Sequence, residues 1–180
     1  LSSGNTELTD ITLCQAVPKG SNMDWIIQKA VELGVSRIQP LVTERTIVRY
    51  SPREGEAKQQ KWQRTALEAC KQCGQNRLPI IETPSTFSNW LLKSSILPKL
   101  KIIASLAQGA IPARECLEQA RSENLAEAAY LVGPEGDFTT EEIKAALEYG
   151  FLPITLGPII LRVETAALLG LSMIRYALDK

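Results

Sequence analysis

The chain has 180 residues, and its 20 basic and 20 acidic side chains give a formal net charge of zero. Hydrophobic residues make up 44% and charged residues 22%, which is typical of a globular domain and excludes a disordered or collagen-like segment. No apolar run approaches the roughly 20 residues of a membrane helix, and the start lacks the pattern of a signal peptide. The sequence contains no histidine, which excludes Ser-His-Asp and Cys-His catalysis and histidine-ligated zinc.

Short apolar runs alternate along the chain with longer amphipathic stretches. In the first half, this pattern predicts strands over 11–17, 37–42 and 78–81, helices over 23–33, 56–73 and 87–92, and a polar loop over 51–55. In the second half, it predicts strands over 101–106, 128–132 and 151–156, and helices over 112–121, 140–149 and 164–178. The alternation implies an α/β fold, with a mainly parallel sheet and helices on both of its faces.

Helical spacing also predicts which side chains face the core. On the helix over 56–73, the expected inward residues are Trp62, Ala66, Ala69 and Cys73. The helix over 140–149 begins at a capping box, Thr139 to Glu142, and its expected inward residues are Ile143, Ala146 and Leu147.

Four cysteines are present, and two of them form a C-x-x-C pair at Cys70 and Cys73. One interpretation is a redox site or half of a zinc site, and the other is two free thiols on a helix that turns toward the core. No second C-x-x-C exists to complete a zinc site. Unpaired cysteines are typical of a reducing compartment, so we expect a cytoplasmic protein.

Positive charge gathers in one region. Residues 37–77 contain nine basic and four acidic side chains, and the rest of the chain has an acidic excess. Two interpretations fit: a surface that faces RNA phosphates, to which Arg45 and Arg77 would contribute, or a solvated helix face with an adjoining loop.

Two glycine-proline turns each follow a predicted buried strand. The first is Gly133-Pro134-Glu135-Gly136, and the second is Leu156-Gly157-Pro158. Ligands of open α/β sheets bind outside the carboxyl ends of the strands, so the two turns predict one pocket with walls made largely of main chain. The G-x-G-x-x-G and P-loop patterns are both missing, which disfavours a nicotinamide dehydrogenase or a P-loop enzyme.

The segments 132–138 and 156–166 together closely resemble the RsmE family, SPOUT-class enzymes that methylate N3 of a uridine in small-subunit (16S) ribosomal RNA. Segments 19–35, 44–46 and 68–74 also resemble that family, so the likeness covers nearly the whole chain. It implies a Rossmann-like sheet with a C-terminal trefoil knot, a rare exception to the usual absence of knots. It further implies a homodimer, with ribosomal RNA as the partner and no membrane or metal.

The resemblance also implies S-adenosylmethionine as the cofactor, bound against the two turns. The residues expected to bind it are Leu131, Gly133, Pro134, Glu135, Gly136, Leu156, Gly157, Ile160, Leu161 and Thr165. Family members carry an N-terminal PUA-like barrel. We therefore expect residues 1–18 to hold its end or a linker plus the first strand, and residues 19–180 to form the methyltransferase domain.

Arg162 and Glu164 are the candidate catalytic residues. Arg162 would stabilise the uracil oxyanion, and Glu164 would act as general base or hold Arg162 in place. The alternative is a structural pair at the start of the last helix, where the helix dipole favours a glutamate. Ile159 and Gln75 stand where the family usually has arginine, and Asp137 stands where it commonly has glycine. Because of these differences, one alternative is that the chain is a dimeric RNA-binding module with weak or no catalytic activity. A further alternative is another α/β enzyme that binds a nucleotide.

Overall fold

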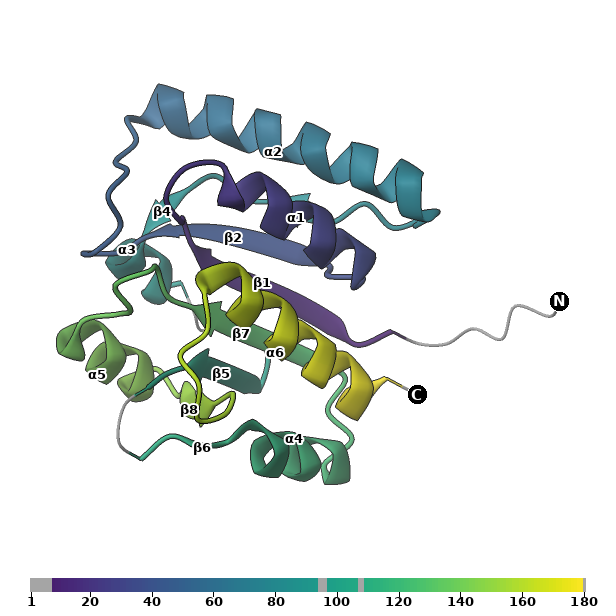
Figure 1. The fold of residues 1–180 in the computed structure, drawn as a ribbon, viewed down its shortest axis with the longest axis vertical. Helices are drawn as coiled ribbons and strands as arrows, with labels where there is room; N and C mark the ends of the chain where they lie inside the picture. Colours follow the sequence, from purple (N-terminus) through teal and green to yellow (C-terminus); the bar gives the residue numbers. More distant parts are fainter. Residues whose placement is uncertain (1–7, 94–96, 107–108, 180) are drawn as a thin grey trace, which may run out of the picture.

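The computed structural model of the protein describes residues 8–93, 97–106 and 109–179. Eight strands and six helices form one α/β domain in the described part of the chain (Figure 1). In the first half, these are β1 (Asp10–Ala16), α1 (Asn22–Glu32), β2 (Arg37–Val42), α2 (Pro52–Cys73), β3 (Ile80–Ile81), β4 (Ser85–Thr86) and α3 (Phe87–Leu91). In the second half, they are β5 (Leu100–Ala104), β6 (Ile111–Pro112), α4 (Ala113–Ser122), β7 (Glu127–Val132), α5 (Thr140–Glu148), β8 (Leu152–Thr155) and α6 (Val163–Leu178).

The strands form one sheet in the order β3-β2-β1-β7-β5-β8-β6, and β4 also pairs with β2. Every pairing is parallel, so the predicted mainly parallel α/β sheet is confirmed. Because all strands run the same way, their carboxyl ends meet at one edge of the sheet. The trefoil knot stays a prediction. No helix in the described part of the chain has the length and hydrophobicity to cross a membrane.

Each face of the sheet has its own hydrophobic core, as expected for a sheet covered by helices on both sides. Neighbouring residues of β7 show the alternation: Tyr130 packs with α1, α2, α4 and α6, whereas Leu131 packs with α3 and α5. In Figure 1, α1 and α6 lie side by side over the central strands, and the described contacts join them directly.

The predicted loop over 51–55 is wrong, because α2 already begins at Pro52. Ser51 is its N-cap: the Ser51 hydroxyl accepts a hydrogen bond from Glu54 N, and the Glu54 carboxylate accepts one from Ser51 N at 2.8 Å. This is a capping box with proline in the first helical turn. The motif Ser-Pro-Arg-Glu carries that signal in the sequence.

Several other boundaries and faces also differ from the expectation. The third and fourth predicted strands are shorter, and β4 and β6 were not predicted. On α2, Cys70 is buried and Cys73 exposed, and on α5 Leu147 is 42% exposed, so the predicted inward positions of Cys73 and Leu147 are wrong. The capping box at Thr139 and Glu142 and the burial of Ala146 are confirmed.

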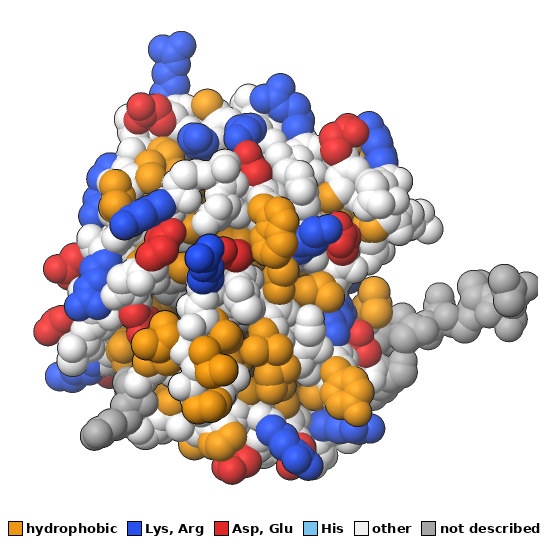
Figure 2. Space-filling view, viewed as in Figure 1, with side chains coloured by type: hydrophobic (Ala, Val, Ile, Leu, Met, Phe, Trp, Pro, Cys, Tyr) orange, Lys and Arg blue, Asp and Glu red, His pale blue; other side chains and the backbone are white. Residues whose placement is uncertain are grey.

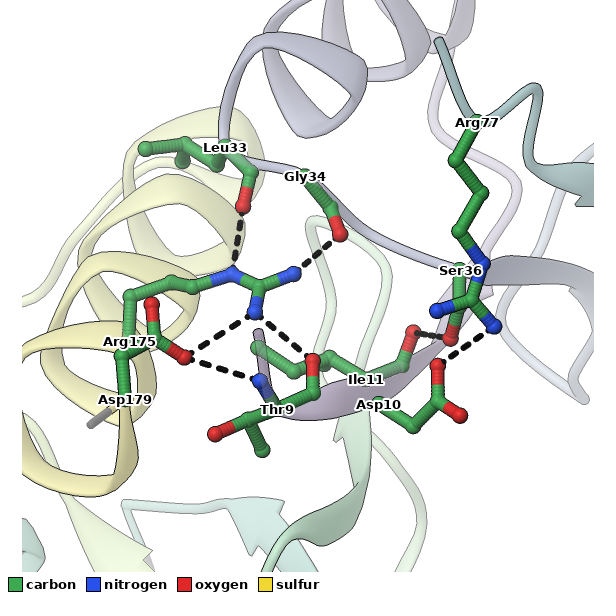
Figure 3. A network of polar contacts seen from close by, with 9 residues as sticks. All are labelled: Thr9, Asp10, Ile11, Leu33, Gly34, Ser36, Arg77, Arg175 and Asp179. Atoms are coloured by element: carbon green, nitrogen blue, oxygen red, sulfur yellow. Dashed lines mark hydrogen bonds and ion pairs between the residues drawn. The ribbon is translucent and has the colours of Figure 1, made fainter. Parts of the chain in front are cut away.

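The carboxyl end of α6 is fastened to the opposite, amino edge of the sheet by Arg175 (Figure 3). Its guanidinium donates to Leu33 O at 2.7 Å, to Thr9 O at 2.7 Å and to Gly34 O. It also pairs with Asp179 at 3.1 Å, and the same carboxylate oxygen accepts from Thr9 N at 2.9 Å. One side chain thus joins the end of α6 to the end of α1 and the start of β1.

We expect Arg175→Ala to lower the free energy of unfolding by about 3 kcal/mol, because a largely buried charged donor leaves three carbonyls without their partner. Chemical denaturation measures the change. Arg114→Ala is the matched control, since Arg114 is an exposed arginine that bonds only Glu118 among the described residues. Equal losses for the two variants would show that the Arg175 network adds no stability.

Candidate cofactor and active site

A cavity of about 460 Å³ lies at the carboxyl edge of the sheet. Its walls come from the segments that follow β5, β7 and β8, from the first turn of α6 and from the first residue of α1. The lining residues are Asn22, Ala104, Ser105, Leu106, Val132, Gly133, Pro134, Glu135, Asp137, Leu156, Gly157, Ile159, Ile160, Leu161, Arg162, Val163, Glu164 and Ala166. Segments that lie far apart in the sequence therefore meet in one site.

The wall after β7 is a tight turn in which Asp137 N donates to Pro134 O at 2.9 Å. Gly133 lies directly against the Phe138 ring, because a Cβ atom at Gly133 would meet two ring carbons at 3.1 Å. Asp137 has a φ of 60°, a left-handed conformation that glycine adopts freely and aspartate more readily than most residues. The geometry explains why aspartate can stand at this position in place of glycine.

Hydrogen bonds fasten this turn and the start of α5 to neighbouring loops. Glu135 accepts from Lys19 N at 2.8 Å, and Arg45 donates to Gly136 O at 2.5 Å. Glu142, in the first turn of α5, accepts from Glu44 N at 2.9 Å. Two of the predicted ligand-binding side chains therefore hold the loops in place: the Glu135 carboxylate holds the loop after β1, and Arg45 holds the loop after β2.

In the wall after β8, Thr155 holds the backbone at Gly157, and the residues that follow are exposed to solvent. The Thr155 hydroxyl accepts from Gly157 N at 3.3 Å and donates to Gly157 O at 3.1 Å. Gly157 has a φ of 129°, which side chains rarely tolerate. Ile159 and Ile160 follow it, and Ile160 is 78% exposed. The second wall is thus main chain at Gly157 and apolar side chains beyond it.

Arg162 and Glu164 stand at the beginning of α6 and both line the cavity. Arg162 is the N-cap residue, and its carbonyl accepts from Ala166 N at 2.8 Å. No hydrogen bond or ion pair joins its guanidinium to Glu164 or to any other described residue. One part of the structural alternative is confirmed, because Glu164 lies in the first turn of α6, where the helix dipole favours a carboxylate. The two side chains make no contact with each other among the described interactions, so Arg162, which is exposed, can reach a ligand.

The cavity has an acidic character. Three of its lining residues carry carboxylates, Glu135, Asp137 and Glu164, and Arg162 is the one basic residue among the described lining residues. Much of the remaining wall is apolar, with leucine, isoleucine, valine and alanine side chains. Such a site suits a cationic ligand that also has a flat apolar part.

Most of the predicted site residues meet at this cavity. Those that line it are Gly133, Pro134, Glu135, Leu156, Gly157, Ile160, Leu161, Arg162 and Glu164. Three of the predicted cofactor-binding residues lie outside the lining: Leu131 packs in the core on the α3 and α5 face, Gly136 lies against Arg45, and Thr165 is exposed. Their cofactor-binding roles stay predictions.

Arg77 lies at the opposite edge of the sheet, where it pairs with Asp10 at 2.7 Å at the start of β1. Gln75 lies near that edge too, since its amide nitrogen would be 3.3 Å from a Cβ at Gly34. Neither residue is close to the cavity within this chain. The missing arginine at Gln75 therefore removes no charge from the cavity wall.

Two parts of the lining are not predicted by the sequence patterns: Asn22, and the end of β5 with the residues after it, Ala104 to Leu106. Asn22 is the first residue of α1, and it lies near the turn after β7 because β1 and β7 are neighbours in the sheet. The segment after β5 reaches the cavity because β5 lies between β7 and β8. The order of the strands in the sheet brings these residues to the cavity, and that order cannot be predicted from a single sequence.

The cysteines take no part in this site. All four are free thiols, and burial raises the pKa of Cys14, Cys70 and Cys116, which keeps these thiols neutral. No group of three or more acidic or cysteine ligands suited to a metal is found among the residues that the structure describes.

The parallel sheet and a cavity at its carboxyl edge are typical of open α/β proteins, a class in which ligands bind at the carboxyl ends of the strands. The family described as RNA methyltransferase domain matches residues 5–175. The ribosomal RNA small subunit methyltransferase E of Synechocystis sp. is 35% identical over 169 residues, which cover 94% of this chain and 54% of that protein.

Two solved structures are similar over nearly the whole chain. A Legionella pneumophila protein in complex with the bound cofactor S-adenosylmethionine has a TM-score of 0.86 and 35% identity, covering 98% of this chain and 69% of that one. Ribosomal RNA small subunit methyltransferase E from Neisseria gonorrhoeae, bound to S-adenosylmethionine, has a TM-score of 0.82 and 32% identity, covering 99% of this chain and 70% of that one.

The chain therefore belongs to the RNA methyltransferase domain family, and within it to the RsmE family of ribosomal RNA small subunit methyltransferases. It spans 54%, 62% and 64% of the length of three curated relatives.

Proposed function

We propose that this chain carries the catalytic domain of an S-adenosylmethionine-dependent enzyme that methylates N3 of a uridine in small-subunit ribosomal RNA. Membership of the RsmE family supports the reaction and the substrate class, and the four free thiols fit a reducing cytoplasm. Residues 19–180 form the methyltransferase domain in this proposal, together with β1, which pairs in the middle of the sheet.

The single observation that carries the proposal is the match between the cavity and the cofactor. A volume of about 460 Å³ lies in the usual range for small-ligand sites. S-adenosylmethionine has a sulfonium, an ammonium and one carboxylate, so its net positive charge complements a cavity with three carboxylates and one guanidinium. Main chain of the two glycine-proline turns would hold it, and the apolar walls suit its adenine ring.

The residues at the start of α6 then act on the RNA base. Bound S-adenosylmethionine supplies a methyl group on a positively charged sulfur, ready for in-line transfer. Arg162 donates hydrogen bonds to the uracil oxygens and stabilises the negative charge that the ring gains when it loses its N3 proton. Glu164, on the same turn of the helix, accepts that proton.

A homodimer completes the proposal. Figure 2 shows hydrophobic side chains gathered over α6 and the segment before it. The exposed apolar residues there are Ile159, Ile160, Leu169 and Tyr176, of which Tyr176 is 90% exposed. A large apolar patch on a helix face is typical of a protein interface, and because this one continues to the cavity rim, a second copy of the chain would border the site.

We expect the protein to bind S-adenosylmethionine without added metal, with a Kd of about 1 μM by calorimetry. Gly157→Ala should weaken binding about tenfold, because the strained φ forces the second wall to move. Gly74→Ala is the matched control: Gly74 has a φ of 74° and open space around it, but it caps the far end of α2. Absence of binding by the unchanged protein would refute the proposed cofactor.

Arg162→Ala in the full-length protein should lower kcat for methyl transfer to ribosomal RNA about 100-fold or more, as loss of an oxyanion donor does. Cofactor affinity should stay within about twofold, since the guanidinium acts on the base. Arg114→Ala serves as the control for losing one positive charge. Unchanged turnover would remove Arg162 from the mechanism.

Sedimentation should find a dimer at micromolar concentration, and Tyr176→Glu should shift it toward monomer because a charge would enter an apolar interface. Leu92→Glu is the control, since Leu92 is 70% exposed just after α3, on the other face of the sheet. If the wild-type protein sediments as a monomer, the proposed homodimer is contradicted, and so is a site bordered by a second copy of the chain.

A further inference from the structure

Tyr130 is a fully buried phenol in the middle of the sheet that the proposed chemistry does not use. It lies on β7, is 0% exposed, and its hydroxyl donates to Ala166 O at 2.8 Å. Burial raises the pKa of this phenol, so the hydroxyl stays protonated and remains a donor. An apolar side chain would fill the same space, but it would not bind the first turns of α6.

Gly170 on α6 makes room for this ring. A Cβ atom at Gly170 would lie 2.2 Å from Tyr130 Cζ, 2.3 Å from its hydroxyl oxygen and 2.4 Å from Cε1. No side chain fits there unless the helix or the ring moves. Glycine inside a helix is otherwise unfavourable, so the close approach of Tyr130 gives this glycine a physical reason.

The Tyr130–Gly170 contact connects two walls of the cavity. Val132, two residues after Tyr130 on β7, lines the cavity just before the Gly133 turn. Ala166, which accepts the hydroxyl, lines it from α6, and Ala166 N donates to Arg162 O at 2.8 Å. The ring and its hydroxyl therefore set how far the turn of α6 with Arg162 and Glu164 stands from the strand that leads into the cofactor turn.

We infer that Tyr130 and Gly170 together form a lock between β7 and α6, and that Tyr130 is a positioning residue for methyl transfer. The lock sets how close the first turn of α6 lies to β7 and at what angle. Its effect on catalysis rests on the proposed function. Methyl transfer needs the base aligned with the donor, and a displacement of about 1 Å can lower a rate about 100-fold.

The test begins with Tyr130→Phe, which keeps the ring and removes the hydroxyl. We expect kcat for methyl transfer to fall about tenfold in the full-length protein, with cofactor affinity and the KM for RNA unchanged within about twofold. Hydrogen exchange of the backbone amides at 163–168 should become faster in the same variant, a readout that does not depend on activity. Tyr149→Phe is the control, since the described hydrogen bonds of Tyr149, which ends α5, all use its main chain.

A second variant pair separates positioning from packing. Gly170→Ala alone should disturb both stability and kcat, because its Cβ overlaps the ring. Tyr130→Leu combined with Gly170→Ala restores space without the hydroxyl, so stability should recover while kcat stays low. Recovery of kcat in this double variant would overturn the inference and leave a packing contact only.

The lock and the proposed function fail in different ways. A folded wild-type protein that binds no S-adenosylmethionine contradicts the function, yet the hydrogen-exchange comparison still tests the lock. An active wild-type protein whose Tyr130→Phe variant keeps its kcat and its exchange rates overturns the lock alone.

Discussion

The packing of α6 over the middle of the sheet is the constraint on which the site depends. β8 lies near one edge of the sheet, yet α6, only a short segment later, contacts β7, β1 and α1. Arg175 fastens its carboxyl end to the start of β1 and the end of α1, and Tyr130 fastens its first turns to β7. The segment 156–162 must therefore cross the carboxyl edge of the sheet, and it forms one wall of the cavity as it does so.

Two turns of the site depend on glycine and proline, and their backbone conformation explains these residue types. Gly133 and Gly157 permit a close approach and an unusual φ, and the prolines beside them stiffen the turns. Glu135, Arg45 and Glu142 connect the loops to one another, so hydrogen bonds within the protein hold the walls in place. Preorganised main-chain groups lose little entropy on binding, which suits a cofactor that must be held in one orientation.

Local signals in the sequence were reliable where a short motif decides the structure. The capping box at Thr139 and Glu142 and the parallel strands are confirmed, and residues of both glycine-proline turns line one cavity as predicted. The predicted start of α2 is wrong although Ser51 and Glu54 carry the same kind of signal, because Pro52 and Gly55 are as typical of a loop as of a helix that begins with proline. Cys73 and Leu147 were assigned to the wrong side because an apolar stripe on a helix does not fix where its buried face ends.

The sequence by itself determined the α/β class, the two turns that line the cavity, the exclusion of histidine chemistry and the family. The first three follow from composition, from periodicity and from motifs whose residues lie within a few positions of one another, whereas the family follows from the joint resemblance of segments spread along the chain. Only the tertiary structure decided that Asn22 and the segment after β5 join the cavity, that Arg77 lies at the opposite edge, and that Tyr130 fits against Gly170. The physical reason is that strand order and the path of α6 are set by long-range packing, and spacing along the chain does not encode which distant segments become neighbours.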